Sequence, residues 1–246
     1  MPFIGGDVFL DGSIGSATAA VSVPFCDRGG SDTLAMSDEA LFAYFSGAEE
    51  LGVSAGVHAI GDRAIEQCIA TWERGLAKYS DRTTRHFIEH FEIASPDHIA
   101  RCARLGIYLS MQPAFDYVWG GPGALYEQRL GPARTAGMNA IASALQAGAV
   151  VCGGDDSPVC ELSPLAGMHA AMHHHNPSES ISAQAALTMY TYDAARLGHA
   201  EQRTGSLQPG SAADFVVLDR DPIAAGAFDG MTVLQTWSDG MCVYTR

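Results

Sequence analysis

Three polar residues stand where they could share a divalent metal ion. His58 ends one short apolar segment, His90 ends the next, and Asp156 closely follows another further along the chain. Two imidazoles and a carboxylate are a standard set of ligands, or of ligands and base, for zinc and similar divalent ions. Each residue alone is more often a structural polar group, so the residue types leave a metal site and a structural role both open.

The elements expected to position these residues alternate between short strands and amphipathic helices. Strands are predicted over residues 8–10, 54–59, 85–89, 107–111 and 150–153. Such alternation predicts a parallel α/β sheet or barrel, in which the carboxyl ends of all strands open onto one face, so the three polar residues can converge. Five strands are apparent, whereas a closed (β/α)8 barrel has eight.

Helices are predicted between the strands from capping residues and apolar periodicity. Ser37 and Ser95 are expected to cap two of them, and Gly52 and Gly106 to end them. The predicted helices follow Ser37, Gly61 and Ser95 and then cover residues 139–147, 164–175 and 182–197. His169, His173, His174 and His175 fall in the fifth of these helices, where a solvated helix end is favoured over a metal site because no Glu stands between His169 and His173.

A stretch rich in glycine and proline, residues 113–132, is longer than a normal connection and predicts an active-site loop. Its aromatic residues either line an apolar pocket or pack the loop against the protein. These residues are Phe115, Tyr117, Trp119 and Tyr126.

The pattern of residue types changes after residue 204. Apolar, β-branched runs at 215–218, 234–237 and 242–244 predict strands, and Asp239-Gly240 is a hairpin turn signal. The chain is therefore expected to divide into residues 1–204 and residues 205–246, the second part being an antiparallel layer.

Composition excludes several classes of function. The formal charge is −14 and the isoelectric point is about 4.8, which argues against nucleic acid and anionic membranes as partners. Apolar runs too short for a bilayer span, and an amino terminus without a signal-peptide pattern, predict a protein without a membrane segment. Six scattered cysteines predict free thiols and a cytoplasmic location.

Six segments, in order along nearly the whole chain, give the sequence a resemblance to the amidohydrolase superfamily, in its family 3-like branch of metal-dependent hydrolases. They are 10–16 (LDGSIGS), 57–64 (VHAIGDRA), 88–91 (IEHF), 110–115 (SMQPAF), 154–159 (GDDSPV) and 205–214 (GSLQPGSAAD). The resemblance implies an α/β fold with a partial (β/α)8 TIM barrel, strands four to eight, followed by the carboxyl-terminal strands of a small flanking β-sandwich domain.

The resemblance also implies roles for individual residues. His58 and His90 would be metal ligands at the ends of barrel strands five and six. Asp156 would be the aspartate after strand eight, which contacts the metal and acts as general base. Asp11, Gly12 and Gln112 would line the substrate pocket, with Ser13 completing the first turn.

The sequence departs from the family pattern in two ways. The early strands of the β domain and the first barrel strand with its His-x-His pair have no counterpart, since His58 is the first histidine, so the match covers about the carboxyl-terminal half of a typical member. The place of a lysine that can bridge two metals is taken by Asp7, and Lys78, the one lysine, falls in a predicted helix. A lysine-bridged binuclear centre is therefore not expected.

The resemblance implies a hydrolase that uses a divalent metal, zinc or else iron or manganese, to cleave carbon–nitrogen bonds other than peptide bonds in a small amide-like substrate. Two alternatives stay open: a truncated or split-enzyme fragment without independent activity, and a metal-dependent deaminase on the same scaffold. We expect a homo-oligomer or a complementary polypeptide that supplies the amino-terminal half, because five strands of eight leave sheet edges uncovered.

Overall fold

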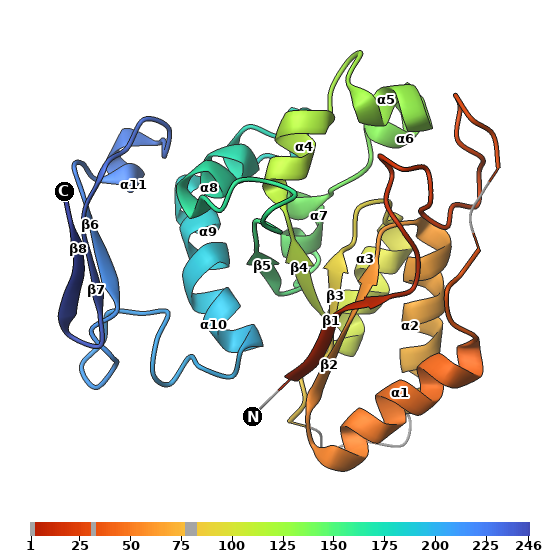
Figure 1. The fold of residues 1–246 in the computed structure, drawn as a ribbon, viewed down its shortest axis with the longest axis horizontal. Helices are drawn as coiled ribbons and strands as arrows, with labels where there is room; N and C mark the ends of the chain where they lie inside the picture. The colour runs from red at the N-terminus through yellow and green to blue at the C-terminus, as the bar shows by residue number, and fades with distance from the viewer. Residues whose placement is uncertain (1–2, 31–32, 77–82) are drawn as a thin grey trace.

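A computed structural model of the chain describes residues 3–30, 33–76 and 83–246; Lys78 and the side chain of Asp7 lie outside the described part. Five parallel strands form one sheet in the order of the sequence (Figure 1). They are β1 (Phe3–Phe9), β2 (Ser54–Ala59), β3 (Phe87–His90), β4 (Tyr108–Met111) and β5 (Val151–Gly153). The parallel α/β architecture is confirmed.

The first strand is longer than predicted. Gly5 and Gly6 have φ angles of 83° and 108°, which are typical of turns, yet both lie within β1. The ladder with β2 shifts register between Gly5 and Phe9, so the strand accommodates the glycines as an irregularity instead of ending at them.

The predicted capping residues define the helices that follow β1 and β3. Ser37 accepts a hydrogen bond from the backbone N–H of Ala40 at the start of α1 (Asp38–Leu51), and Gly52 ends it in the left-handed conformation. Ser95 caps α3 (Pro96–Leu105) in the same way. Two more helices of this layer are α2 (Asp62–Leu76) and α7 (Ile141–Gln146).

The segment predicted as an active-site loop, residues 113–132, is largely helical and not a loop. The segment forms α4 (Pro113–Trp119) and α5 (Leu125–Leu130), and α6 (Pro132–Thr135) follows. Pro113 and Pro132 stand at first helical positions, where their missing N–H groups have no role. Gly120 and Gly131 end the two helices, so the residues that suggested a loop are boundaries between helices.

The last helices before the carboxyl-terminal sheet differ from prediction at one end. Helix α8 (Pro164–Met172) ends before His173, so His174 and His175 lie beyond the helix and not on it. The helical stretch predicted over 182–197 is confirmed as α9 (Ala183–Thr188), a π-helical turn at Met189–Asp193 and α10 (Ala194–Leu197). A short 3₁₀ turn at Pro177–Glu179 connects α8 to α9.

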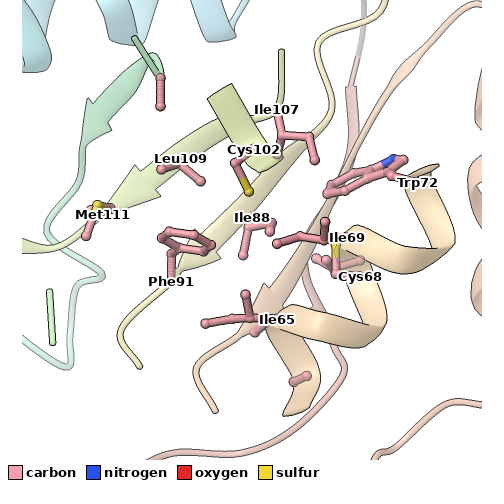
Figure 2. Packing of buried hydrophobic residues seen from close by; sticks show 14 of the residues in the cluster. Ile65, Cys68, Ile69, Trp72, Ile88, Phe91, Cys102, Ile107, Leu109 and Met111 are labelled. Atoms are coloured by element: carbon pink, nitrogen blue, oxygen red, sulfur yellow. The ribbon is translucent and has the colours of Figure 1, made fainter. Parts of the chain in front are cut away.

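The main core lies between the five-stranded sheet and helices α2 and α3 (Figure 2). Every residue of β2 is buried. Apolar side chains recur at helical spacing along the buried face of α2, and they meet those of β3 and β4. The fully buried contributors include Ile65, Cys68, Ile69, Trp72, Ile88, Phe91, Cys102 and Leu109.

The carboxyl-terminal segment forms a separate three-stranded antiparallel sheet (Figure 1). Strands β6 (Phe215–Leu218), β7 (Val233–Ser238) and β8 (Met241–Thr245) confirm the three predicted runs, and a short helix, α11 (Pro222–Ala225), follows β6. The turn at Asp239-Gly240 has φ angles of 51° and 77°, as its sequence predicts. Phe228 attaches this segment to α8 and α9, because it is buried among their apolar side chains.

None of the described helices is long and apolar enough to cross a membrane.

Replacing Leu109 in the interior strand β4 tests this core. Leu109 is fully buried, so Leu109→Ala should lower the free energy of unfolding by about 2–5 kcal/mol. Leu207→Ala is the matched control, because Leu207 is 77% exposed and its truncation should change stability by no more than about 0.5 kcal/mol. Urea unfolding measures both, and equal losses in the two variants would contradict this packing.

Candidate active site

The carboxyl ends of β2 and β3 bring the rings of His58 and His90 together. Their centroids lie 4.4 Å apart with the ring planes at 70°. Both residues are buried, and Phe115 of α4 stacks on the far side of the His90 ring at 5.8 Å. The predicted convergence of these two imidazoles is therefore present in the fold.

A chain of hydrogen bonds determines which nitrogen of His90 carries the proton. The Gln112 amide donates from Nε2 to Glu89 Oε2, at 3.3 Å, and to the Ser110 carbonyl, at 3.4 Å. This orientation turns Gln112 Oε1 toward His90 Nδ1, 2.8 Å away, so Nδ1–H must donate. The lone pair then lies on Nε2 of His90, as in a histidine prepared to bind a metal.

His58 is oriented by a backbone acceptor. Its Nε2 lies 3.2 Å from the carbonyl oxygen of Gly12 and 3.7 Å from Asp11 Oδ1. Because both neighbours are acceptors, the proton belongs on Nε2 and the lone pair on Nδ1. These contacts thus involve opposite nitrogens of the two rings, Nε2 of His58 and Nδ1 of His90.

Asp156 lies on the wall of the same cavity as His58 and His90. Its φ angle is 53° and that of His90 is 76°, in a region that non-glycine residues rarely occupy. Strained backbone of this kind persists where the surrounding fold holds it and is common at functional sites. Asp155, by contrast, accepts hydrogen bonds from the Ser163 N–H at 2.8 Å and the Tyr190 hydroxyl at 3.4 Å.

Asp11 holds the loop that closes over β2. Its carboxylate accepts the backbone N–H groups of Ala20, Ile60 and Gly61 at 2.7–3.0 Å. Gly12 has no room for a side chain, because an added Cβ would lie 2.0 Å from Thr18 Oγ1. These contacts are structural, and contact of Asp11 or Gly12 with substrate stays a prediction.

The cavity beside the histidines has a volume of about 450 Å³ and mostly apolar walls. Of the four aromatic residues for which pocket lining and packing were both left open, Phe115, Trp119 and Tyr126 line this cavity, whereas Tyr117 is exposed. A second cavity of about 350 Å³ shares His90 and Asp156 with it and also contacts Gln112. The cavity of about 450 Å³ is lined by Phe9, Ser13, Ile14, Gly15, His58, Ile60, His90, Glu92, Phe115, Trp119, Leu125, Tyr126, Asp156 and Val159.

Glu92 is a cavity residue that the sequence patterns did not single out. Burial raises its pKa to about 8, with repulsion from Asp11 and Asp116 adding to the shift and the neighbouring polar groups of Tyr126 and Asn139 opposing it. A carboxyl group two residues after His90 was the available signal. Glu92 is thus a protonated acid in the cavity at neutral pH.

The donors fit a divalent metal. Two buried imidazoles, those of His58 and His90, and an aspartate on the same cavity wall are the nitrogen and oxygen ligands that zinc, iron and manganese accept. The Gln112 amide and the Gly12 carbonyl are the outer partners that such histidines normally have.

Comparison with known proteins finds a family match over almost the whole chain. The profile of the amidohydrolase family matches residues 4–244. The chain is similar to Protein LONG AFTER FAR-RED 3 of Arabidopsis thaliana, with 31% identity over 98% of this chain and 43% of that protein. It is also similar to N-substituted formamide deformylase of Arthrobacter pascens, with 30% identity over 81% of this chain and 38% of that protein.

A solved structure resembles the fold closely. An uncharacterized metal-dependent hydrolase from Pyrococcus furiosus superposes with a TM-score of 0.76 and 30% identity, over 87% of this chain and 44% of that one. The chain therefore spans less than half the length of the proteins it resembles.

The protonated Glu92 predicts a pH dependence of stability in chelator-treated protein. Folded Glu92 keeps its proton up to about pH 8, whereas the unfolded chain loses it near 4.5. The folded state then binds more protons, so the free energy of unfolding falls as the pH rises through this window, by at most about 1.4 kcal/mol per pH unit.

Glu92→Gln should remove this slope, whereas Glu39→Gln, at an exposed position, should retain it. Urea unfolding at several pH values between about 5 and 9 measures the difference. The same slope in the Glu92 variant as in the parent protein would show that Glu92 ionises normally in the fold.

Proposed function

Since the chain belongs to the amidohydrolase family, we propose that it is the carboxyl-terminal part of a metal-dependent hydrolase of carbon–nitrogen bonds other than peptide bonds. The observation that carries this proposal is the buried pair of His58 and His90, whose rings meet at 4.4 Å on the wall of a cavity that Asp156 also lines. The likeness to an N-substituted formamide deformylase supports the choice of bond.

We assign each residue a role in the proposed reaction. His58 and His90 hold the divalent ion, with zinc proposed first and iron or manganese as alternatives, and Asp156 completes its contacts. When bound, the ion supplies Lewis acidity that polarises the scissile carbonyl and lowers the pKa of water from 15.7 to about 7. Asp156 accepts the proton of the attacking water and passes it to the leaving nitrogen as the carbon–nitrogen bond breaks.

The substrate would be a small amide with an apolar or aromatic substituent. The cavity of about 450 Å³ next to His90 has room for such a molecule, and Phe115, Trp119 and Tyr126 give it aromatic walls. Gln112 contacts the adjoining cavity and would meet the polar end of the substrate beside His90.

The five parallel strands would correspond to strands four to eight of a (β/α)8 barrel. Residues 1–204 would then be the barrel part, and residues 205–246 would supply three strands to a small β-sandwich domain. The fivefold parallel order and the separate antiparallel sheet both fit this arrangement (Figure 1).

The missing surfaces would be covered by an amino-terminal half from another polypeptide or by a second copy of the chain. Strand β1 is the first edge of the sheet, and Phe3 and Phe9 on it are each 53% exposed. On β8, Met241 and Val243 are exposed as well. Uncovered edges with apolar side chains favour association. A cytoplasmic location is also proposed, and the buried thiols of Cys68 and Cys102 are compatible with it.

Loss of the proposed base tests the mechanism. Asp156→Asn should abolish release of formate or amine from N-substituted formamides, because asparagine cannot accept the proton, while leaving the circular dichroism spectrum unchanged. Glu161→Gln, at an exposed position five residues along, is the matched control and should keep full turnover. Near-normal kcat in the Asp156 variant would overturn the assignment of the base.

The ligand pair has its own test. His58→Ala/His90→Ala should lower the bound metal by about one ion per chain, measured by elemental analysis of a monodisperse fraction prepared without chelator. His98→Ala/His199→Ala removes two histidines elsewhere and should leave the metal content unchanged. An unchanged metal content in the His58/His90 variant would refute the proposed ligands.

A further inference from the structure

A second group of ligand-type side chains lies away from His58 and His90, between α4 and the segment that follows α8. Asp116 of α4, His174 and His175 have one ligand atom each, all within 4.8 Å of one another. The two helices pack side by side (Figure 1). None of the three residues belongs to the segments that carry the family resemblance, and the sequence patterns favoured a solvated helix end for the two histidines.

The cluster is buried and asymmetric. The Asp116 and His174 side chains are each 1% exposed, and that of His175 is 14% exposed. Asp116 Oδ1 lies 2.5 Å from His175 Nδ1 and 3.2 Å from His174 Nε2, and Asp116 Oδ2 accepts the backbone N–H of His175 at 2.9 Å. One carboxylate thus faces both imidazoles in a dry environment.

The buried Nε2 atom of His174 points to a ligand. It has no hydrogen-bond partner among the described residues, although it is aimed at Asp116 Oδ1. A buried nitrogen in this state pays a desolvation penalty unless something binds it. Nδ1 of the same ring lies 3.0 Å from the Asn176 N–H and 3.2 Å from the Asn176 carbonyl.

These two backbone contacts serve alternative tautomers of His174: the Asn176 N–H donates to Nδ1 when the proton is on Nε2, and a proton on Nδ1 replaces that bond by one to the Asn176 carbonyl. With the proton on Nδ1, the ring donates to the Asn176 carbonyl and presents a lone pair from Nε2 toward Asp116. A histidine ligand normally makes this kind of outer hydrogen bond to a backbone carbonyl.

We propose that Asp116, His174 and His175 form a second divalent-cation site, of the zinc type, that fastens α4 to the chain beyond α8. Three side-chain donors of nitrogen and oxygen type suit zinc, with a water as fourth ligand. Ligands of a tetrahedral zinc ion lie about 3.3 Å apart, so the 3.2 Å contact of His174 already matches and the 2.5 Å contact of His175 must open slightly.

The site has a consequence for the neighbouring cavity. Phe115 and Trp119, on the same helix as Asp116, are walls of the cavity beside His90. Gly120 ends that helix against the cluster, since an added Cβ would lie 2.7 Å from Asp116 Oδ1 and 2.9 Å from His175 Nδ1. A cation held here would fix the wall that the aromatic residues of α4 form.

Zinc stoichiometry separates this site from the proposed catalytic one. Chain titrated with zinc chloride and passed through a desalting column should retain about two ions, His58→Ala/His90→Ala about one, and His174→Gln/His175→Gln about one. His169→Gln/His173→Gln is the matched control, because those two rings stack on each other at 4.1 Å in and beyond α8, and it should retain about two.

A visible absorption spectrum tests the coordination directly. It requires only that the His58→Ala/His90→Ala protein folds. Cobalt(II) added to that variant should give the intense visible absorption of a tetrahedral site, and Asp116→Asn in the same background should abolish it. Unchanged zinc content in His174→Gln/His175→Gln, or absence of a tetrahedral cobalt spectrum, would overturn this site while leaving the proposed hydrolase untouched. Loss of zinc from the His169/His173 control would overturn it as well.

Discussion

The parallel pairing of β2 with β3 is the constraint on which the candidate active site depends. The ladder places Ala59 beside His90 and His58 beside Glu89, and neighbours in a parallel ladder share a face. A regular strand would therefore direct His90 away from His58. The left-handed backbone at His90 ends the pleat at that residue, and the two rings meet at 4.4 Å. The left-handed backbone at the end of β3 thus produces the close approach of the His90 and His58 rings.

The same edge of the sheet explains why the cavity has apolar walls and yet contains ionisable side chains. Helices α4 and α5 follow β4 and cover the histidines with aromatic side chains, which exclude water and raise the pKa of Glu92. Gln112 enters this environment with fixed partners, between Glu89 and His90. A dry site with oriented donors strengthens every electrostatic interaction within it.

Local signals predicted most of the fold. Ser37, Gly52 and Ser95 mark helix ends that the structure reproduces, because capping depends on a few adjacent residues. The segment from Pro113 was mistaken for a loop, since proline and glycine occur both within loops and at helix boundaries. Glu92 and the burial of His174 could not be predicted from sequence, because both depend on helices brought together from distant parts of the chain.

The position of bound metal tests the central claim most directly. Crystals of the chain grown with zinc should show an anomalous scattering peak at the zinc edge between His58 Nδ1 and His90 Nε2, with Asp156 facing it across the cavity. We expect this peak in the parent protein and its disappearance in the His58→Ala/His90→Ala variant. A well-ordered cavity without an anomalous peak at saturating zinc would contradict the assignment of these histidines as metal ligands.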